Sequence, residues 1–194
     1  GLPPDGEAYL FLDLDGETDQ IKKEIRQVKQ ICSDMSVIEV RVVENEKESA
    51  SYWKARSNLY PALVSAMKKI IIEDVTVPRD RLPDFARSIS EISRESGLMI
   101  DISGHAGDGN FHPTIMLKEI NPEIEQIAQQ AAEAVVKCAL KLGGGISGEH
   151  GIGIHKARFS ALQLGDRQIA LQKQIKKAID PLGIMNPGKI WLEG

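Results

Sequence analysis

Asp108-Gly109 is the feature that most restricts how this chain can fold, because it predicts a tight turn between two strands. Both residues tolerate the positive φ that the centre of a type I′ turn requires. The turn would join strands at 98–105 and 110–117. With Asp108 and Gly109 at its centre, His105 stands directly opposite His112, and opposed residues share a face with Cβ atoms roughly 4.5–5.5 Å apart. Two imidazoles at this distance can bind one divalent cation, or they can simply hydrogen-bond on a polar hairpin.

Strand and helix patterns alternate along the rest of the chain. Further strands are expected at 7–14, 37–43 and 69–77, and helices at 18–35, 46–67, 80–96, 121–142, 155–163 and 166–179. Pro61 is a candidate break in the second helix. Alternating elements followed by a hairpin favour an α+β fold: a ferredoxin-like antiparallel or mixed sheet with helices packed on one face.

Composition excludes several classes of protein. The net charge is −4 and no basic stripe is present, so nucleic acid is not an expected partner. No apolar run approaches the roughly 20 residues of a membrane-spanning helix. Cys32 and Cys138 occupy apolar positions of predicted helices, which favours free thiols in a reducing compartment.

The segment 143–153, GGGISGEHGIG, contains six glycines in eleven positions. Its isoleucines favour burial, although a flexible surface loop remains an alternative. The glycine spacings typical of phosphate-binding loops are absent, and Glu149 would repel a phosphate.

His105, His112 and Glu149 together form a set of two histidines and one carboxylate, which suits Zn²⁺, Mn²⁺ or Fe²⁺ with an open coordination position. An ion with an open position can bind a substrate oxygen and lower its pKa. His150 follows Glu149 directly and is placed to act as a general base. We expect His155 to be a surface residue.

Three motifs carry a resemblance to a known family: HAGDGNFHP, GGGISGEHGIG and AIDPLGIMNPGKI. Together they resemble the C-terminal domain of FAD-linked 2-hydroxy acid oxidases and dehydrogenases, such as the glycolate oxidase flavoprotein subunit and D-lactate dehydrogenase, in the vanillyl-alcohol-oxidase-like superfamily. The segments YWKARSNLYPAL and IIIEDVTVPRDRLPDF are similar to earlier blocks of the same domain, so the resemblance covers nearly the whole chain.

The resemblance implies a role for each matching residue. His105, His112 and Glu149 would bind the metal. His150 would take the hydroxyl proton of the substrate while a hydride passes to the flavin. The remaining implied contacts are with the substrate carboxylate (Arg56), the flavin ring (Asn110) and the junction with the flavin domain (Asn186 and Lys189).

The resemblance also implies that residues 1–194 are a C-terminal substrate and cap domain. FAD would be bound mainly by an N-terminal domain that is absent from this chain, so we expect this chain alone to be inactive. The stretch Ile70–Glu73 lacks a lysine found in relatives that oxidise larger diacids, which favours glycolate or D-lactate as the substrate. Expected partners are an electron acceptor (an iron–sulfur protein, a quinone or a cytochrome) and a second copy in a homodimer. The expected location is cytoplasmic, or peripheral to the inner face of the membrane.

Two alternatives remain open from the sequence. One is a stand-alone metal-dependent hydrolase that uses the same ligands, with His150 activating water. The other is a non-catalytic ferredoxin-like module that binds a small acid without a metal.

Overall fold

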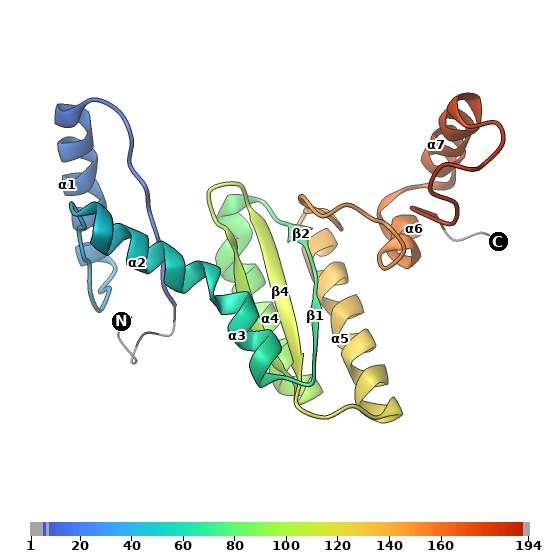
Figure 1. The fold of residues 1–194 in the computed structure, drawn as a ribbon, viewed down its shortest axis with the longest axis horizontal. Coiled ribbons are helices and arrows are strands. Elements are labelled where there is room, and N and C mark those ends of the chain that lie inside the picture. Colours follow the sequence, from blue (N-terminus) through green and yellow to red (C-terminus); the bar gives the residue numbers. More distant parts are fainter. Residues whose placement is uncertain (1–5, 7, 192–194) are drawn as a thin grey trace. The chain divides into compact units, whose positions relative to one another are not determined.

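The computed structural model describes residue 6 and residues 8–191. The chain divides into two compact units, residues 1–60 and residues 61–194 (Figure 1).

The first unit contains two helices, α1 (Thr18–Asp34) and α2 (Glu46–Ser57). The helix predicted at 18–35 is confirmed, but its apolar stripe is not buried, since Met35 is 74% exposed. The helix predicted at 46–67 is divided. α2 ends before Asn58 and α3 covers Leu59–Ala66, so the break lies at Asn58 and not at Pro61.

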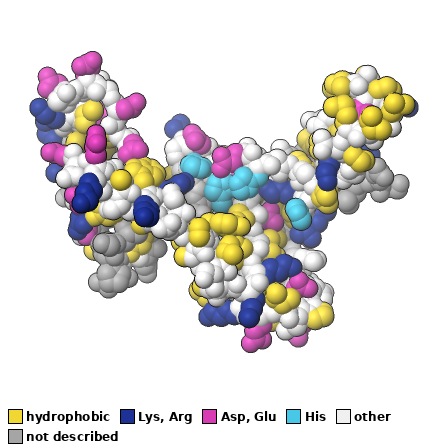
Figure 2. All heavy atoms as spheres, in the orientation of Figure 1, with side chains coloured by type: hydrophobic (Ala, Val, Ile, Leu, Met, Phe, Trp, Pro, Cys, Tyr) yellow, Lys and Arg dark blue, Asp and Glu magenta, His cyan; other side chains and the backbone are white. Residues whose placement is uncertain are grey.

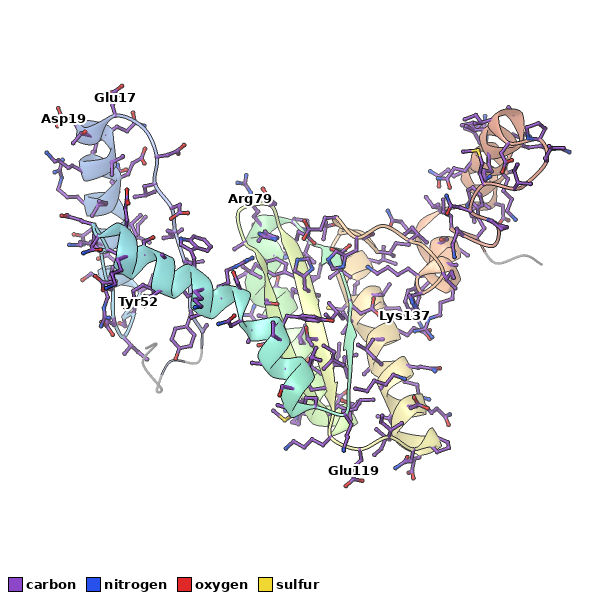
Figure 3. The ribbon with its side chains drawn as sticks, in the orientation of Figure 1. Glu17, Asp19, Tyr52, Arg79, Glu119 and Lys137 are labelled. Atoms are coloured by element: carbon purple, nitrogen blue, oxygen red, sulfur yellow. The ribbon has the colours of Figure 1, made fainter. Side chains whose placement is uncertain are left out.

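The strands predicted at 7–14 and 37–43 are wrong for the residues described there, 8–14 and 37–43, which form no strand; residue 7 lies outside the described residues. In the second segment, the guanidinium of Arg41 donates to Glu39 and to the hydroxyl of Tyr52 on α2. Figure 3 labels Tyr52. Apolar alternation gives a segment strand-like character, but a strand also needs a neighbour for its backbone hydrogen bonds. Apolar alternation alone therefore did not make either segment a strand.

The second unit is built on an antiparallel sheet of four strands: β1 (Lys69–Ile72), β2 (Val75–Thr76), β3 (Met99–His105) and β4 (Asn110–Leu117). β4 pairs with β1 and β2 on one side and with β3 on the other. Helix α4 (Leu82–Ser96), preceded by a 3₁₀ turn at Arg79–Arg81, joins β2 to β3. This is a split βαβ unit, which confirms the expected α+β class.

Helices α4 and α5 (Pro122–Lys141) run alongside the sheet and cover one of its faces (Figure 1). Alternate residues of β4 point toward them, and Phe111, Ile115 and Leu117 are each no more than 4% exposed. Each such side chain contributes roughly 1.5–3 kcal/mol through burial. The opposite face therefore receives Asn110, His112 and Thr114.

The C-terminal part contains a 3₁₀ turn at Ala157–Phe159, helix α6 (Ser160–Gln163) and helix α7 (Asp166–Ile179). The helix predicted at 155–163 is thus shorter than expected, whereas the helix predicted at 166–179 is confirmed. Among the described residues, no helix combines the length and apolarity needed to cross a membrane.

Candidate metal centre

The hairpin brings His105 and His112 to one face, but not in the predicted register. His105 pairs with Asn110, and His112 pairs with Ser103, so direct opposition of the two histidines is wrong. The turn closes earlier than expected, because the N–H of Asp108 donates to the carbonyl oxygen of His105 (3.0 Å).

The error equals two residues, and side chains alternate with a period of two, so both histidines keep the same face. Their rings lie diagonally across the hairpin, with centroids 5.6 Å apart and planes at 84°. The predicted proximity of the two imidazoles therefore survives the change of register.

Asp74 joins this face from the other side of β4. Ile72 lies opposite Thr114 and Val75 lies opposite Phe111, so the register continues without an insertion and places Asp74 opposite His112. The Asp74 side chain is fully buried, and its Oδ1 lies 3.6 Å from His112 Nδ1. The sequence reasoning missed Asp74. The available signal was a pair of acids interrupting the apolar strand KIIIEDVTV.

The glycine-rich loop lies along β2 as an additional short pairing. Thr76 and Gly145 exchange two backbone hydrogen bonds, of 3.0 and 3.1 Å. Gly144 permits this approach, because a Cβ there would lie 1.7 Å from the carbonyl oxygen of Thr76. The loop is consequently fixed to the sheet and is not a free linker.

Beyond this pairing, the loop wraps around the Asp74 carboxylate. Oδ2 accepts hydrogen bonds from the Ser147 hydroxyl (2.8 Å) and from the backbone N–H groups of residues 148, 149 and 150 (2.9, 3.2 and 3.0 Å). Burial alone would raise the pKa of Asp74, but these hydrogen bonds and the charge of Lys156 lower it to about 2. The carboxylate is therefore ionised at neutral pH.

Lys156 is a second buried charged residue of this region that the sequence pattern did not single out. It is buried, and its ammonium donates to the carbonyl oxygens of Asp74 and of Ile146 (2.9 Å for the latter). Burial lowers its pKa, while the charges of Asp74 and Glu73 oppose this shift. The lysine links the strand to the start of the loop.

Glu149 completes a triangle of donor atoms with the two histidines. Its Oε1 lies 3.1 Å from His112 Nε2 and 3.5 Å from His105 Nε2. A tetrahedral ion with bonds of 2.0–2.1 Å requires donors about 3.3 Å apart, so the spacing fits a metal such as Zn²⁺. Figure 2 shows histidine and acidic side chains gathered together on this face of the second unit.

A second group of three donors, Asp74, His112 and His150, is also close enough to consider. It suits an ion less well, because Asp74 Oδ2 already accepts four hydrogen bonds. The rings of His112 and His150 are stacked, with planes 5° apart and centroids 4.9 Å apart. Imidazole lone pairs lie in the ring plane, so stacked rings do not converge on one ion.

His112 and His150 differ in their surroundings. His112 is largely buried, and burial, together with the charge of His150, lowers its pKa and favours the neutral form that a metal ligand needs. His150 is exposed, and its backbone is fixed by Asp74. The arrangement leaves the His150 imidazole accessible beside the donor triangle, where a proton could be transferred.

Asn110 lies on the same face, between Thr76 and His105. It is 7% exposed, and its Oδ1 has no hydrogen-bond partner in the described part of the chain. Gly148 packs directly on it, since a Cβ at residue 148 would lie 2.1 Å from Asn110 Oδ1. The structure therefore brings Asn110 to the donor triangle; its predicted contact with a flavin stays a prediction.

The three other predicted residues lie in segments outside the sheet and the glycine-rich loop. Asn186 is exposed in the C-terminal tail, and Lys189 is half-buried near Ile190, whose N–H donates to the carbonyl oxygen of Gly153 (2.8 Å). Arg56 lies on α2 in the first unit, where it is exposed and its guanidinium lies 6.0 Å from the centroid of the Trp53 ring. The roles expected for these three residues stay predictions.

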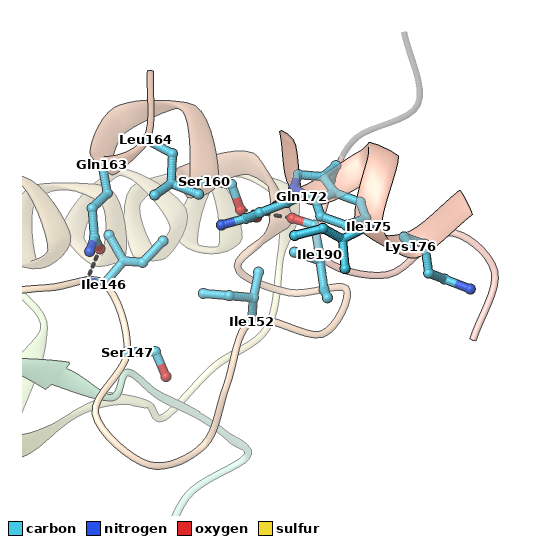
Figure 4. A pocket seen from close by; sticks show the side chains of 11 residues that line it. Ile146, Ser147, Ile152, Ser160, Gln163, Leu164, Gln172, Ile175, Lys176 and Ile190 are labelled. Carbon is cyan, nitrogen blue, oxygen red and sulfur yellow. Dashed lines mark hydrogen bonds between the residues drawn. The ribbon is translucent and has the colours of Figure 1, made fainter. Parts of the chain in front are cut away.

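A separate hollow lies between the glycine-rich loop, α6 and α7 (Figure 4). Its lining is largely apolar and includes Ile152, Ile175 and Trp191. Its one charged lining residue, Lys176, pairs with Asp180. The hollow thus lacks the convergent titratable groups of the donor triangle.

Comparison with known proteins decides the family. Residues 1–190 match the family described as FAD linked oxidases, C-terminal domain. The chain belongs to this family. It is 33% identical to the glycolate oxidase subunit GlcD of Bacillus subtilis over 98% of its length, and 33% identical to that of Escherichia coli K12 over 97%. It is 32% identical to the mitochondrial D-lactate dehydrogenase [cytochrome] of Kluyveromyces lactis over 94% of its length.

The chain spans only part of each of these relatives. It covers 41% and 38% of the two glycolate oxidase subunits and 32% of the D-lactate dehydrogenase. Family membership accordingly concerns the C-terminal domain.

Proposed function

We propose that residues 1–194 form the substrate and cap domain of an FAD-dependent dehydrogenase or oxidase that converts a small 2-hydroxy acid to the 2-oxo acid. FAD would be bound mainly by an N-terminal domain outside this chain. The observation that carries the proposal is the donor triangle of His105, His112 and Glu149 with His150 beside it. Membership of the FAD-linked oxidases supports the reaction type.

The donor set fits a divalent ion by chemistry and by spacing. Two neutral imidazoles and a carboxylate suit Zn²⁺, Mn²⁺ or Fe²⁺, and three protein ligands leave a position for a substrate oxygen. When bound, such an ion would lower the pKa of the substrate hydroxyl, and FAD would supply the acceptor for the hydride. Glu149 adds a negative charge that offsets part of the charge of the ion.

His150 would accept the hydroxyl proton of the substrate. Its imidazole is exposed beside the triangle and stacks on His112, so a hydroxyl bound there lies within its reach. The backbone hydrogen bond to Asp74 keeps this base in place. Arg56 would bind the substrate carboxylate, because its planar guanidinium matches a carboxylate in a bidentate geometry.

The sheet face beside the triangle favours a small monoacid. Ile70 and Ile72 lie opposite Met116 and Thr114 on the same face as Asp74. These side chains offer no cation for a second carboxylate of a substrate. The names of the relatives, glycolate oxidase and D-lactate dehydrogenase, agree with such a substrate. The electron acceptor, the homodimer and the cytoplasmic or membrane-peripheral location stay predictions.

Metal content measured by mass spectrometry tests the site. We expect near-stoichiometric Zn²⁺, Mn²⁺ or Fe²⁺ in the wild-type chain and its loss in His112→Ala and Glu149→Ala. His155→Ala is the matched control, because His155 is exposed and outside both groups of donors, and it should retain the metal. Equal metal in all four proteins, or none in the wild type after loading, would contradict the site.

Flavin bleaching tests the reaction in the FAD-loaded protein that contains this chain. Glycolate or D-lactate added without oxygen should bleach the flavin absorbance, whereas a 2-hydroxy diacid should do so slowly. His150→Asn should keep the metal and slow bleaching by about 10²-fold or more. Unchanged bleaching in this variant would exclude His150 as the base.

A further inference from the structure

Asp74 contacts both His112 and the loop that carries Glu149, although neither is near it in the sequence. We propose that Asp74 is the positioning residue of the metal centre, with Oδ1 setting the tautomer of His112 and Oδ2 holding the peptide that carries Glu149 and His150. The expected effect of Asp74 on metal binding rests on the function proposed above. The contacts of Asp74 with His112 and with the loop do not depend on that function.

Asp74 lies beside the ring of His112. The Nδ1 of His112 is buried and has no hydrogen-bond partner in the described part of the chain, and Asp74 Oδ1 lies 3.6 Å away. Carboxylate oxygens face both ring nitrogens, Asp74 Oδ1 at Nδ1 and Glu149 Oε1 at Nε2 (3.1 Å). Asp74 therefore favours a hydrogen on Nδ1, and a metal bound between His112 and Glu149 would take the lone pair of Nε2. A carboxylate that orients a metal-binding histidine in this way is common in metalloproteins.

Asp74 also holds the glycine-rich loop. Three consecutive backbone N–H groups, from residues 148 to 150, donate to Asp74 Oδ2, and the Ser147 hydroxyl is a fourth donor. The N–H of Glu149 is shared with Oδ1 (3.3 Å). A segment so rich in glycine has high conformational freedom and needs such contacts to define it. The directions of the Glu149 and His150 side chains follow from the backbone that this oxygen fixes.

Replacing Asp74 with asparagine separates these effects from a change of size. The amide has a single acceptor oxygen, and four donors surround the position of Oδ2, so that oxygen will face the loop. The amide NH₂ then faces His112 Nδ1, which must become an acceptor. The imidazole hydrogen moves to Nε2, where it blocks the metal-binding atom.

Two measurements on the 194-residue chain test the proposal: the imidazole tautomer by ¹⁵N NMR without metal, and the Zn²⁺ affinity by competition with a chromophoric chelator. We expect Nδ1 of His112 to carry a hydrogen in the wild type. Asp74→Asn should switch His112 to the Nε2–H tautomer and lower the Zn²⁺ affinity about 10–100-fold. Glu73→Gln is the matched control: the same chemical change one residue earlier, on the opposite face by alternation, should leave both readouts unchanged.

Asp74→Asn with an unchanged Nδ1–H tautomer and a Zn²⁺ affinity within about twofold of the wild type would overturn the proposal. A wild type that binds no Zn²⁺ but shows the expected tautomer switch would refute the metal centre and uphold the orientation of His112. If Asp74→Asn does not fold, Ser147→Ala removes one donor to Oδ2. It should weaken Zn²⁺ binding about five- to tenfold with the tautomer unchanged, and an unaltered affinity would refute the role of Oδ2.

Discussion

Gly144→Ala should strongly disturb the candidate metal centre, although residue 144 does not contact the centre. A Cβ on residue 144 would lie 1.7 Å from the carbonyl oxygen of Thr76, and this neighbour is backbone that cannot rotate away. The loop must therefore leave β2. Three backbone hydrogen bonds are then at risk: the two between Thr76 and Gly145 (3.0 and 3.1 Å) and the one from Gly144 to Ala139 (2.9 Å). At about 1 kcal/mol each, Gly144→Ala should lower the free energy of unfolding by about 3 kcal/mol.

This loss should appear as a fall in melting temperature of about 6–12 °C, measured by circular dichroism. Zn²⁺ affinity should fall as well, because Glu149 moves with the loop. Gly107→Ala is the control, since a Cβ there has no atom within 4 Å. A melting temperature within about 2 °C of the wild type, with unchanged Zn²⁺ binding, would refute the claim that the Thr76–Gly145 pairing holds the loop.

Three further predictions follow from the same contacts. Gly148→Ala should weaken Zn²⁺ binding about tenfold or more in chelator competition, because its Cβ would lie 2.1 Å from Asn110 Oδ1; equal affinity would contradict this. The ionised Asp74 should contribute about 2 kcal/mol of stability above pH 4 that is lost as the pH falls toward 2, since its pKa is lowered from 3.8 to about 2. Urea unfolding at several pH values should show this loss in the wild type and not in Asp74→Asn. Lys156→Met should lower the free energy of unfolding of the second unit by about 2–4 kcal/mol in urea, because two buried carbonyl oxygens lose their donor. The control is Glu125→Gln, which removes the exposed Lys69–Glu125 ion pair and should cost about 0.5 kcal/mol or less.

The hairpin and its histidines could be predicted because the information is local. A turn signal with strand patterns on both sides predicts β3 and β4, and the period of two places His105 and His112 on one face even when the register is shifted by two residues. The predicted register of the turn was wrong because a hydrogen bond from the N–H of Asp108 to the carbonyl oxygen of His105 closes the turn. The sequence pattern does not predict this hydrogen bond.

Asp74 could not be placed from the sequence, because its role depends on pairing between segments about 40 and 70 residues apart. The acidic pair Glu73-Asp74 lies inside the strand predicted at 69–77, and the sequence pattern does not show what would satisfy a buried carboxylate there. In the structure the register continues through this pair, and the Asp74 carboxylate is satisfied by the glycine-rich loop. The absence of strands at the described residues 8–14 and 37–43 has a related cause, since strand formation depends on a partner and alternation alone does not supply one.

The most direct measurement is X-ray absorption spectroscopy of the zinc-loaded chain, which reports the atoms bound to the ion. We predict nitrogen and oxygen donors at about 2.0–2.2 Å, with the scattering pattern of two imidazoles that falls to one in His105→Ala. Sulfur at about 2.3 Å, or a pattern that His105→Ala leaves unchanged, would show that His105, His112 and Glu149 do not form the metal centre.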